Sequence, residues 1–214
     1  MRNPEADYIG CRRCPLHESR RHIVFRGTGK CSRGTVERNG NLLYYKGELQ
    51  EGDEEGLLGP LRKAPLVLFI GEAPGSAEDL TGMPFMGDAG RVFDLCLSYT
   101  RTDFRFHITN ILACRPWTIS DRGNIVNRPP KQTEIEQCLP RVKEILNSTT
   151  YSGVIHLGAV ARDNIQVENS LHLTHPSAIY RMEYKLYDIR EFALKIDQYV
   201  NSLSEARHKN TDGG

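Results

Sequence analysis

The chain has 214 residues, enough for one well-buried domain and a tight fit for two. Hydrophobic residues make up 39% and charged residues 26% of the sequence, close to the averages of globular proteins, which excludes fibrous repeats and a largely disordered chain. A formal net charge of +1 gives no overall signature of nucleic-acid binding, so the distribution of basic residues over the surface matters more than their total.

No apolar run in the sequence is long enough to span a bilayer. The longest, Leu66 to Ile70, is far shorter than the roughly 20 residues that a membrane helix needs. Residues 1–5 are polar and lead into a cysteine pair, unlike the apolar stretch of a secretory signal. We therefore expect an intracellular monomer, cytoplasmic or associated with the nucleoid, with no membrane partner.

The first predicted element is a hairpin within residues 27–62, a segment rich in glycine and charge. Asn39 and Gly40 lie between two strand-like runs, and this pair is a strong signal for a tight β-turn. Because the main alternation of strands and helices begins only after this segment, we interpret 27–62 as an insertion.

The main alternation begins at residues 64–71, where a short apolar run ends in glycine and leads into a loop. The elements expected after it are a helix within 88–100, a strand over 106–113, a helix over 132–146, a strand over 154–157, a helix over 159–165, a strand over 171–173 and a closing helix over 186–203. This order predicts an α/β fold: a three-layer α/β/α domain with a central, mostly parallel four-stranded sheet.

Residues 1–203 are expected to form this single domain. Residues 115–137 carry several turn residues and few candidates for the core, so they are interpreted as an enlarged exposed loop. The tail, residues 204–214, is expected to be disordered.

The chain contains six cysteines, which in an intracellular protein favour metal binding or isolated core thiols over disulfides. Cys96 lies in an apolar helical pattern and is expected to be a buried thiol, whereas the sequence assigns no role to Cys31. The candidate metal ligands are the CxxC pair Cys11 and Cys14 and the downstream Cys114 and Cys138.

Unusual polar residues follow the predicted strands. Glu72 comes directly after the first main strand, Asn110 lies near the end of the second, and His175 follows the fourth, with Phe85 in a nearby loop. Taken singly, an asparagine at a strand end or an isolated histidine is usually structural. Ligands of open α/β sheets, however, bind at the carboxyl ends of the strands. Together these residues predict a crevice for a small, planar, polar ligand.

Several ordered motifs across residues 8–182 resemble family 4 of the uracil-DNA glycosylases, which are iron-sulfur enzymes. The resemblance leaves out the segment 27–62 and the tail. The motifs are Gly71–Gly75, Glu78–Asp79, Gly82–Gly90, Thr109–Pro116, Asn127–Pro130, Glu134–Cys138 and His175–Ser177.

The resemblance implies an enzyme that hydrolyses the N-glycosidic bond of uracil in single- or double-stranded DNA, leaving free uracil and an abasic site. Such an enzyme must turn the nucleotide out of the stack and read its free edge. Phe85 would stack on the ring, Asn110 would pair with N3–H and O4, and His175 would donate to a uracil oxygen. The resemblance also implies that Glu72 orients a water or offsets charge on the sugar, and that Glu78 excludes the methyl group of thymine.

The remaining implied site residues contact the substrate or the DNA backbone. Those implied for the substrate are Gly71, Ala73, Asn127 and Ser177. Those implied for the DNA are Arg115, Arg128 and Arg181.

The resemblance also implies a 4Fe–4S cluster on Cys11, Cys14, Cys114 and Cys138, with a structural role. Zinc is the physical alternative at a site of four cysteines. The stretch between Cys114 and Cys138 is longer than usual for the family, and residues 115–137 contain no histidine that could capture uracil covalently. Two other functions stay open: a non-catalytic member that binds modified DNA or a protein partner, and an enzyme acting on another base such as hypoxanthine.

Overall fold

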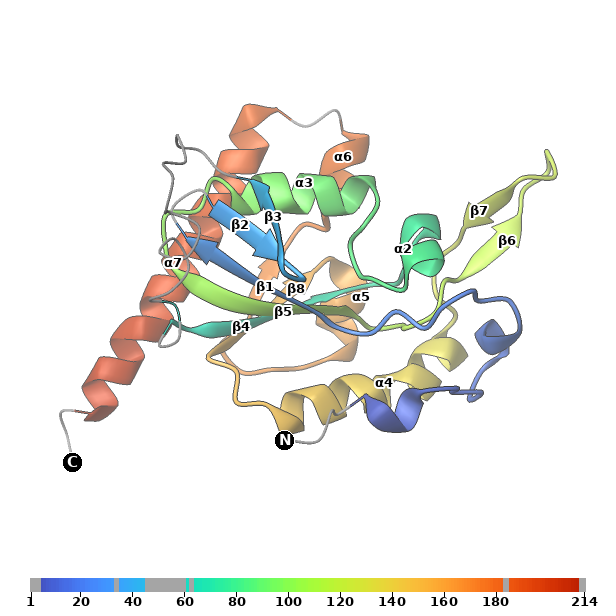
Figure 1. The fold of residues 1–214 in the computed structure, drawn as a ribbon, viewed down its shortest axis with the longest axis horizontal. Helices are drawn as coiled ribbons and strands as arrows, with labels where there is room; N and C mark the ends of the chain where they lie inside the picture. The colour runs from blue at the N-terminus through green and yellow to red at the C-terminus, as the bar shows by residue number, and fades with distance from the viewer. Residues whose placement is uncertain (1–4, 33–34, 45–60, 62–63, 183–184, 212–214) are drawn as a thin grey trace.

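The computed structural model describes residues 5–32, 35–44, 61, 64–182 and 185–211. These residues form three layers, with a seven-stranded sheet between two layers of helices (Figure 1). The order of the strands across the sheet is β3-β2-β1-β5-β4-β8-β9. The predicted α/β/α layering is therefore confirmed, whereas the sheet is wider than the four strands expected.

The four predicted main strands form the parallel half of the sheet. They are β4 (Leu66–Gly71), β5 (Phe104–Asn110), β8 (Gly153–Leu157) and β9 (Leu171–Leu173). Neighbouring strands within this set are parallel, and the register places Gly71 beside Asn110 at the carboxyl ends of β4 and β5. The alternation of elements thus predicted this half of the sheet correctly.

Three further strands extend the sheet from β5. They are β1 (Gly27–Ser32), β2 (Thr35–Arg38) and β3 (Asn41–Tyr44), all antiparallel to their neighbours. The predicted hairpin is present, because Asn39 and Gly40 both have positive φ, 52° and 82°, as a tight turn between strands requires. Residues 33, 34, 45–60 and 62 of the inserted segment lie outside the described residues.

The strand β1 is the main correction to the predicted sheet. A β-carbon on Gly29 would lie 2.2 Å from the Phe106 ring, so this glycine lets β1 pack closely beside β5. Glycine has a low intrinsic preference for strands, which is why the pattern at 27–32 did not predict one.

Helices cover both faces of the sheet (Figure 1). Val67 and Phe69 of β4 belong to one core cluster, and Leu68 and Ile70, which point the other way, belong to a second. The first cluster includes residues of α3 (Asp88–Leu97), α6 (Pro176–Arg181) and α7 (Leu186–Thr211), and the second includes residues of α4 (Gln132–Ser148) and α5 (Ala159–Asn164).

Two predicted irregular segments are ordered elements. The first half of the loop 115–137 forms an antiparallel hairpin of β6 (Trp117–Ile119) and β7 (Ile125–Asn127), which stands off the body of the domain (Figure 1). Helix α7 continues to Thr211, into the tail 204–214 for which disorder is expected. The remaining short helices are η1 (Ala6–Tyr8), η2 (Pro15–Glu18) and α2 (Ser76–Thr81).

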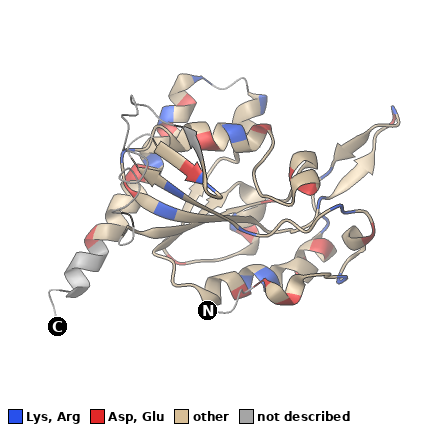
Figure 2. Ribbon diagram, viewed as in Figure 1, with Lys and Arg blue, Asp and Glu red and all other residues tan. Residues whose placement is uncertain are grey.

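The charged residues of the described chain are interspersed by sign along the helices and the sheet (Figure 2), in keeping with the small net charge. None of the helices in these described ranges is both long and apolar enough to cross a membrane.

A buried ion pair links the N-terminal segment to the sheet. Arg141 of α4 is fully buried, and its Nη1 lies 2.5 Å from Oε1 of Glu5 and 3.1 Å from Oγ1 of Thr109. Its Nη2 donates to the backbone carbonyl of Asn110. One side chain therefore joins the start of the chain, α4 and the end of β5.

We predict that Arg141→Met lowers the free energy of unfolding by about 3–5 kcal/mol, because the buried Glu5 carboxylate would lose the cation of its buried ion pair. Urea unfolding followed by circular dichroism measures this loss. Lys143→Met, at an exposed position of the same helix, is the control and should change stability by less than about 0.5 kcal/mol. Equal effects of the two substitutions would contradict the prediction.

Candidate active site

A cleft of about 1250 Å³ opens at the carboxyl ends of β4, β5 and β9. Glu72, Phe85, Asn110 and His175, which are far apart in the sequence, all line it. The topology brings them together because parallel strands end at the same edge of the sheet. A single cleft thus holds a carboxylate, an aromatic ring, an amide and an imidazole.

Most of the other residues expected in the site also lie at this cleft. Its lining includes Ala73, Glu78, Asn127, Arg128, Ser177 and Arg181. Gly71 lies behind the wall instead of in it: a β-carbon there would be 2.4 Å from Oδ1 of Asn110 and 2.9 Å from the Phe85 ring. A side chain at position 71 would therefore displace two residues that line the cleft.

Two of the arginines expected to contact DNA already have protein partners. Arg115 is not part of the cleft lining, and its Nε donates to Oδ1 of Asn127 at 2.7 Å. Arg128 bonds to both carboxylate oxygens of Glu134, at 2.9 and 2.5 Å, and this contact lowers the pKa of Glu134. Arg128 therefore braces the β6–β7 hairpin against the first turn of α4.

Asn110 lines the cleft and contains a buried acceptor atom. The residue is only 3% exposed, and its backbone carbonyl accepts from Arg141. Its side-chain Oδ1 is buried and has no hydrogen-bond partner among the described residues. Because an unpaired buried acceptor is costly, its presence beside a cleft indicates a ligand that supplies the missing donor.

Phe85 forms one wall of the cleft, next to His175. Its ring is 4% exposed and lies 5.9 Å from the His175 ring between centroids, with the two planes inclined by 33°. The backbone at Phe85 has φ of 57°, in the left-handed region that residues other than glycine seldom adopt. Such strain persists only where the surroundings hold it in place, and it is concentrated at functional sites.

The protonation of His175 is fixed by its position at the start of α6. Its Nδ1 accepts from the backbone N–H of Ser177 at 3.1 Å, so the neutral ring carries its proton on Nε2. Burial lowers the pKa of His175 to about 4, with a further lowering by the positive charge of Arg181 and an opposing effect of Glu78. At neutral pH the ring is therefore an uncharged donor.

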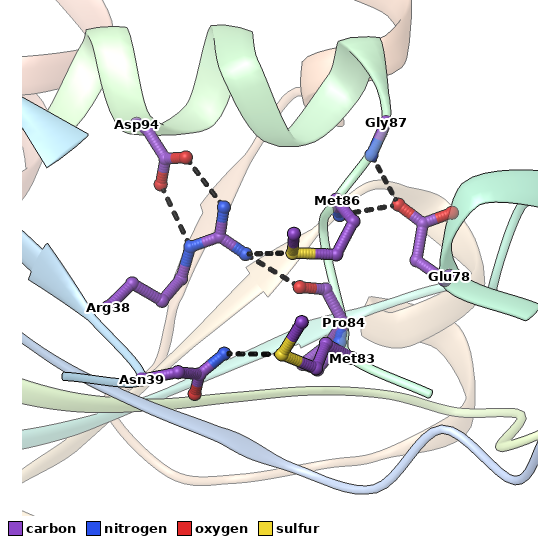
Figure 3. Close-up of polar contacts among 8 residues, drawn as sticks. All are labelled: Arg38, Asn39, Glu78, Met83, Pro84, Met86, Gly87 and Asp94. Carbon is purple, nitrogen blue, oxygen red and sulfur yellow. Dashed lines mark hydrogen bonds and ion pairs between the residues drawn. The ribbon is translucent and has the colours of Figure 1, made fainter. Parts of the chain in front are cut away.

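The two glutamates of the cleft have different surroundings. Burial raises the pKa of Glu72, and the positive charge of Arg181 opposes this effect. Glu78 accepts three backbone N–H groups, from Gly75 at 2.8 Å, Met86 at 2.7 Å and Gly87 at 2.8 Å, two of them drawn in Figure 3. Its carboxylate thus anchors the loop around Phe85, a function that the sequence reasoning missed.

Two arginines that support the site were also missed, Arg141 behind Asn110 and Arg38 near Phe85. A signal for Arg141 was available, because it shares the apolar face of its helix with Cys138 and Ile145. A charged residue on such a face needs a buried partner. For Arg38 the sequence offers no comparable signal.

The four candidate metal ligands border one small cavity, which lies between the N-terminal segment and α4. Nη1 of Arg20 lies 3.6 Å from Sγ of Cys114, and the backbone N–H of Ala113 lies 3.4 Å from Sγ of Cys138. None of the four, Cys11, Cys14, Cys114 and Cys138, forms a disulfide with another described residue. As placed in the described chain, no three or more His, Cys, Asp or Glu side chains form a group that could hold a metal ion.

The other two cysteines are buried elsewhere. Cys96 lies in the first core cluster, as its helical pattern predicted. Cys31 lies in β1, where Sγ donates to the carbonyl of Leu97 and is 2.9 Å from Oγ1 of Thr100. Cys31 is therefore a structural thiol between the inserted strands and α3.

We predict that His175 titrates with a pKa near 4 and carries its proton on Nε2 at pH 7, as measured by long-range ¹⁵N–¹H NMR. Because the unfolded chain takes up this proton near pH 6.5, the group contributes stability above that pH and loses it as pH falls toward 4. Arg181→Met should raise the pKa. A midpoint near 6.5, or a proton on Nδ1, would be inconsistent with the buried, Ser177-bonded imidazole.

Comparison with known proteins identifies the family of this chain. Residues 59–201 match the family described as the Uracil DNA glycosylase superfamily. The type-4 uracil-DNA glycosylase of Archaeoglobus fulgidus is 32% identical over 133 residues, covering 61% of this chain and 60% of that protein. The type-4 uracil-DNA glycosylase of Pyrobaculum aerophilum is 30% identical over 154 residues, covering 71% of this chain and 57% of that protein.

The chain thus spans about 60% of the length of these two relatives. Among solved structures, wild-type SMUG2 of Pedobacter heparinus aligns with a TM-score of 0.48 and 16% identity, over 72% of this chain and 82% of that one. The family match alone extends over more than half of the sequence, from residue 59 to residue 201. The chain belongs to the uracil-DNA glycosylase superfamily.

Proposed function

We propose that this protein excises uracil from DNA by hydrolysing the N-glycosidic bond, which leaves free uracil and an abasic site. The observation that carries the proposal concerns Asn110, which lines the same cleft as Phe85 and His175 and whose buried Oδ1 has no hydrogen-bond partner among the described residues. The names of the two relatives, both type-4 uracil-DNA glycosylases, support it. An enzyme of this kind acts where DNA is, in keeping with the expected intracellular location.

Asn110 supplies the base recognition. Uracil presents an N3–H donor beside the O4 acceptor, and one side-chain amide matches both, with Oδ1 accepting and Nδ2 donating. Cytosine presents the opposite pattern, an N3 acceptor beside an amino group, and would face Asn110 donor to donor and acceptor to acceptor. Since Oδ1 is buried and has no partner among the described residues, a base without the matching donor leaves it unpaired.

His175 and Glu72 supply the electrostatics of bond cleavage. As the N-glycosidic bond breaks, negative charge develops on the departing base and positive charge on the sugar. The neutral His175 ring donates a hydrogen bond from Nε2 to the base and keeps its proton, in accord with its lowered pKa. Glu72, half-buried across the cleft, offsets the sugar cation and orients the attacking water.

The DNA backbone is held at the rim of the cleft. Arg181 is exposed there and forms no hydrogen bond or ion pair with the other described residues, so its guanidinium is available for a phosphate. Ser177 at the start of the same helix lies beside it. Arg115 and Arg128 contribute from the hairpin side, where their existing bonds to Asn127 and Glu134 limit them to weaker contacts.

We predict that Asn110→Ala lowers the single-turnover rate of uracil release by roughly 100-fold or more, because the loss of oriented hydrogen bonds to a reacting group typically costs this much. The assay uses a labelled oligonucleotide with one uracil, followed by alkaline cleavage of abasic sites. Asn124→Ala, at an exposed position of the β6–β7 hairpin, is the matched control.

The outcome separates the candidate functions. No strand scission by the wild-type protein at enzyme excess would favour a non-catalytic member that binds modified DNA or a protein partner. Scission that survives Asn110→Ala at full rate would remove Asn110 from base recognition. Release of another base, such as hypoxanthine, in preference to uracil would reassign the specificity.

We also propose that Cys11, Cys14, Cys114 and Cys138 hold a 4Fe–4S cluster, with zinc as the alternative. Their shared cavity, and the two donors directed at Cys114 and Cys138, support this set of ligands. Hydrogen bonds to sulfur suit thiolates that bind a cluster. Such a cluster would cross-link the N-terminal segment to the end of β5 and to α4. It would take no part in the hydrolysis.

We predict that Cys14→Ser lowers bound iron and acid-labile sulfide by at least about half, since a four-thiolate site loses one ligand. Metal analysis and visible absorption of the purified protein measure the change. Cys31→Ser is the control, because a hydroxyl can replace its thiol toward Leu97 and Thr100. Zinc in place of iron in the wild-type protein would select the alternative metal.

A further inference from the structure

The inserted hairpin reaches the Phe85 loop through Arg38, the last residue of β2 (Figure 3). Arg38 is 5% exposed and bonds to both carboxylate oxygens of Asp94 in α3, at 3.1 Å from Nε and 2.6 Å from Nη2. Its Nη1 donates to the backbone carbonyl of Pro84 at 2.6 Å. One guanidinium therefore connects the hairpin, a core helix and the residue directly before Phe85.

The carbonyl of Pro84 belongs to the peptide unit that enters Phe85. Its orientation is linked to the backbone dihedrals at Phe85, where φ is 57°. On the other side, Glu78 accepts the N–H groups of Met86 and Gly87 (Figure 3). A buried cation thus holds the carbonyl before Phe85 and a buried anion holds the amides after it, which fixes the strained residue from both directions.

The second partner of Arg38 is itself well fixed. Asp94 is 4% exposed and follows Phe93, whose ring lies 5.4 Å from the Phe85 ring between centroids. The planar guanidinium satisfies Asp94 with two donors and Pro84 with a third. A lysine at position 38 could pair with Asp94, but its single ammonium could not reproduce this fixed arrangement of donors.

We propose that Arg38 is a positioning residue for Phe85, so that the inserted hairpin completes the wall on which the base stacks. The inference rests on the proposed function for its effect on catalysis, and on the contacts above for its effect on Phe85. It assigns a role to an inserted segment that the family resemblance leaves out.

The first test is a double-mutant cycle of Arg38→Met and Phe85→Leu in single-turnover uracil release. Arg38→Met alone should lower the maximal rate about 10- to 100-fold, because small misplacements of a positioning group cost this much. The half-saturating DNA concentration should change much less, because the phosphate contacts lie elsewhere. In the Phe85→Leu background the same substitution should cost little further, because Arg38 acts through Phe85.

Three further variants separate positioning from stability. Arg38→Lys keeps the buried charge and should fold, yet show most of the loss in rate. Asn39→Gly keeps the left-handed turn but removes the side-chain contact with Met83 of the same loop, and should retain the wild-type rate. Val36→Ala, at a fully buried position of the same strand, should lower stability while the rate at a permissive temperature stays within about twofold.

The second test does not depend on activity. With 4-fluorophenylalanine incorporated, the ¹⁹F resonance of Phe85, assigned by its loss in Phe85→Leu, should shift or broaden in Arg38→Lys and stay in place in Asn39→Gly. If the wild-type protein releases no uracil, the proposed function fails and the ¹⁹F result still decides the positioning role. An unchanged resonance in Arg38→Lys, an unchanged rate in both Arg38 variants of an active enzyme, or fully additive losses in the cycle would overturn the inference.

Discussion

The buried ion pair between Arg141 and Glu5 is the constraint on which the rest of the structure depends. The two residues are 136 positions apart, and their contact fixes the segment before the cysteine pair against α4. Through its bond to the carbonyl of Asn110, Arg141 also fixes the end of β5. Charges at this depth are tolerated only when they are paired and hydrogen-bonded, so these three elements keep one relative placement. The backbone that carries the Asn110 side chain is therefore held by residues outside the cleft lining.

The same principle recurs at Glu78 and His175 in the cleft and at Arg38 near Phe85, whose side chains all bond to backbone groups. Glu78 is held by three amides, His175 by the amide of Ser177, and Arg38 by a carbonyl and a carboxylate. Catalysis by electrostatic stabilisation requires groups that do not reorganise as charge develops. The bonds to Glu78 and His175 restrict these two side chains in this way, whereas Oδ1 of Asn110 has no partner among the described residues.

Much of this arrangement could be predicted from the sequence because it follows from local patterns and one topological rule. The apolar run at β4 and the Asn39–Gly40 turn predicted their elements, and parallel strands bring their carboxyl ends together wherever they form. The rest depends on contacts that spacing does not encode. Strand β1 packs beside β5 because Gly29 has no side chain to collide with the ring of Phe106. Strand β7 is exposed at all three positions, so its sequence shows no alternation of apolar and polar residues. The bonds of Arg38 and Glu78 join residues whose proximity only the folded chain creates.

The left-handed backbone at Phe85 limits how this position can diverge among related proteins. Branched side chains such as valine or isoleucine are poorly tolerated at φ of 57°, whereas glycine and asparagine fit easily. Replacement of Phe85 by glycine or asparagine would therefore relieve the backbone strain but would also remove the flat apolar ring. Only another aromatic residue keeps a flat apolar surface at this position, and its backbone is as strained as that of Phe85. Ancestral reconstruction should accordingly find this position either held as an aromatic residue or lost to a small polar one, with few aliphatic intermediates.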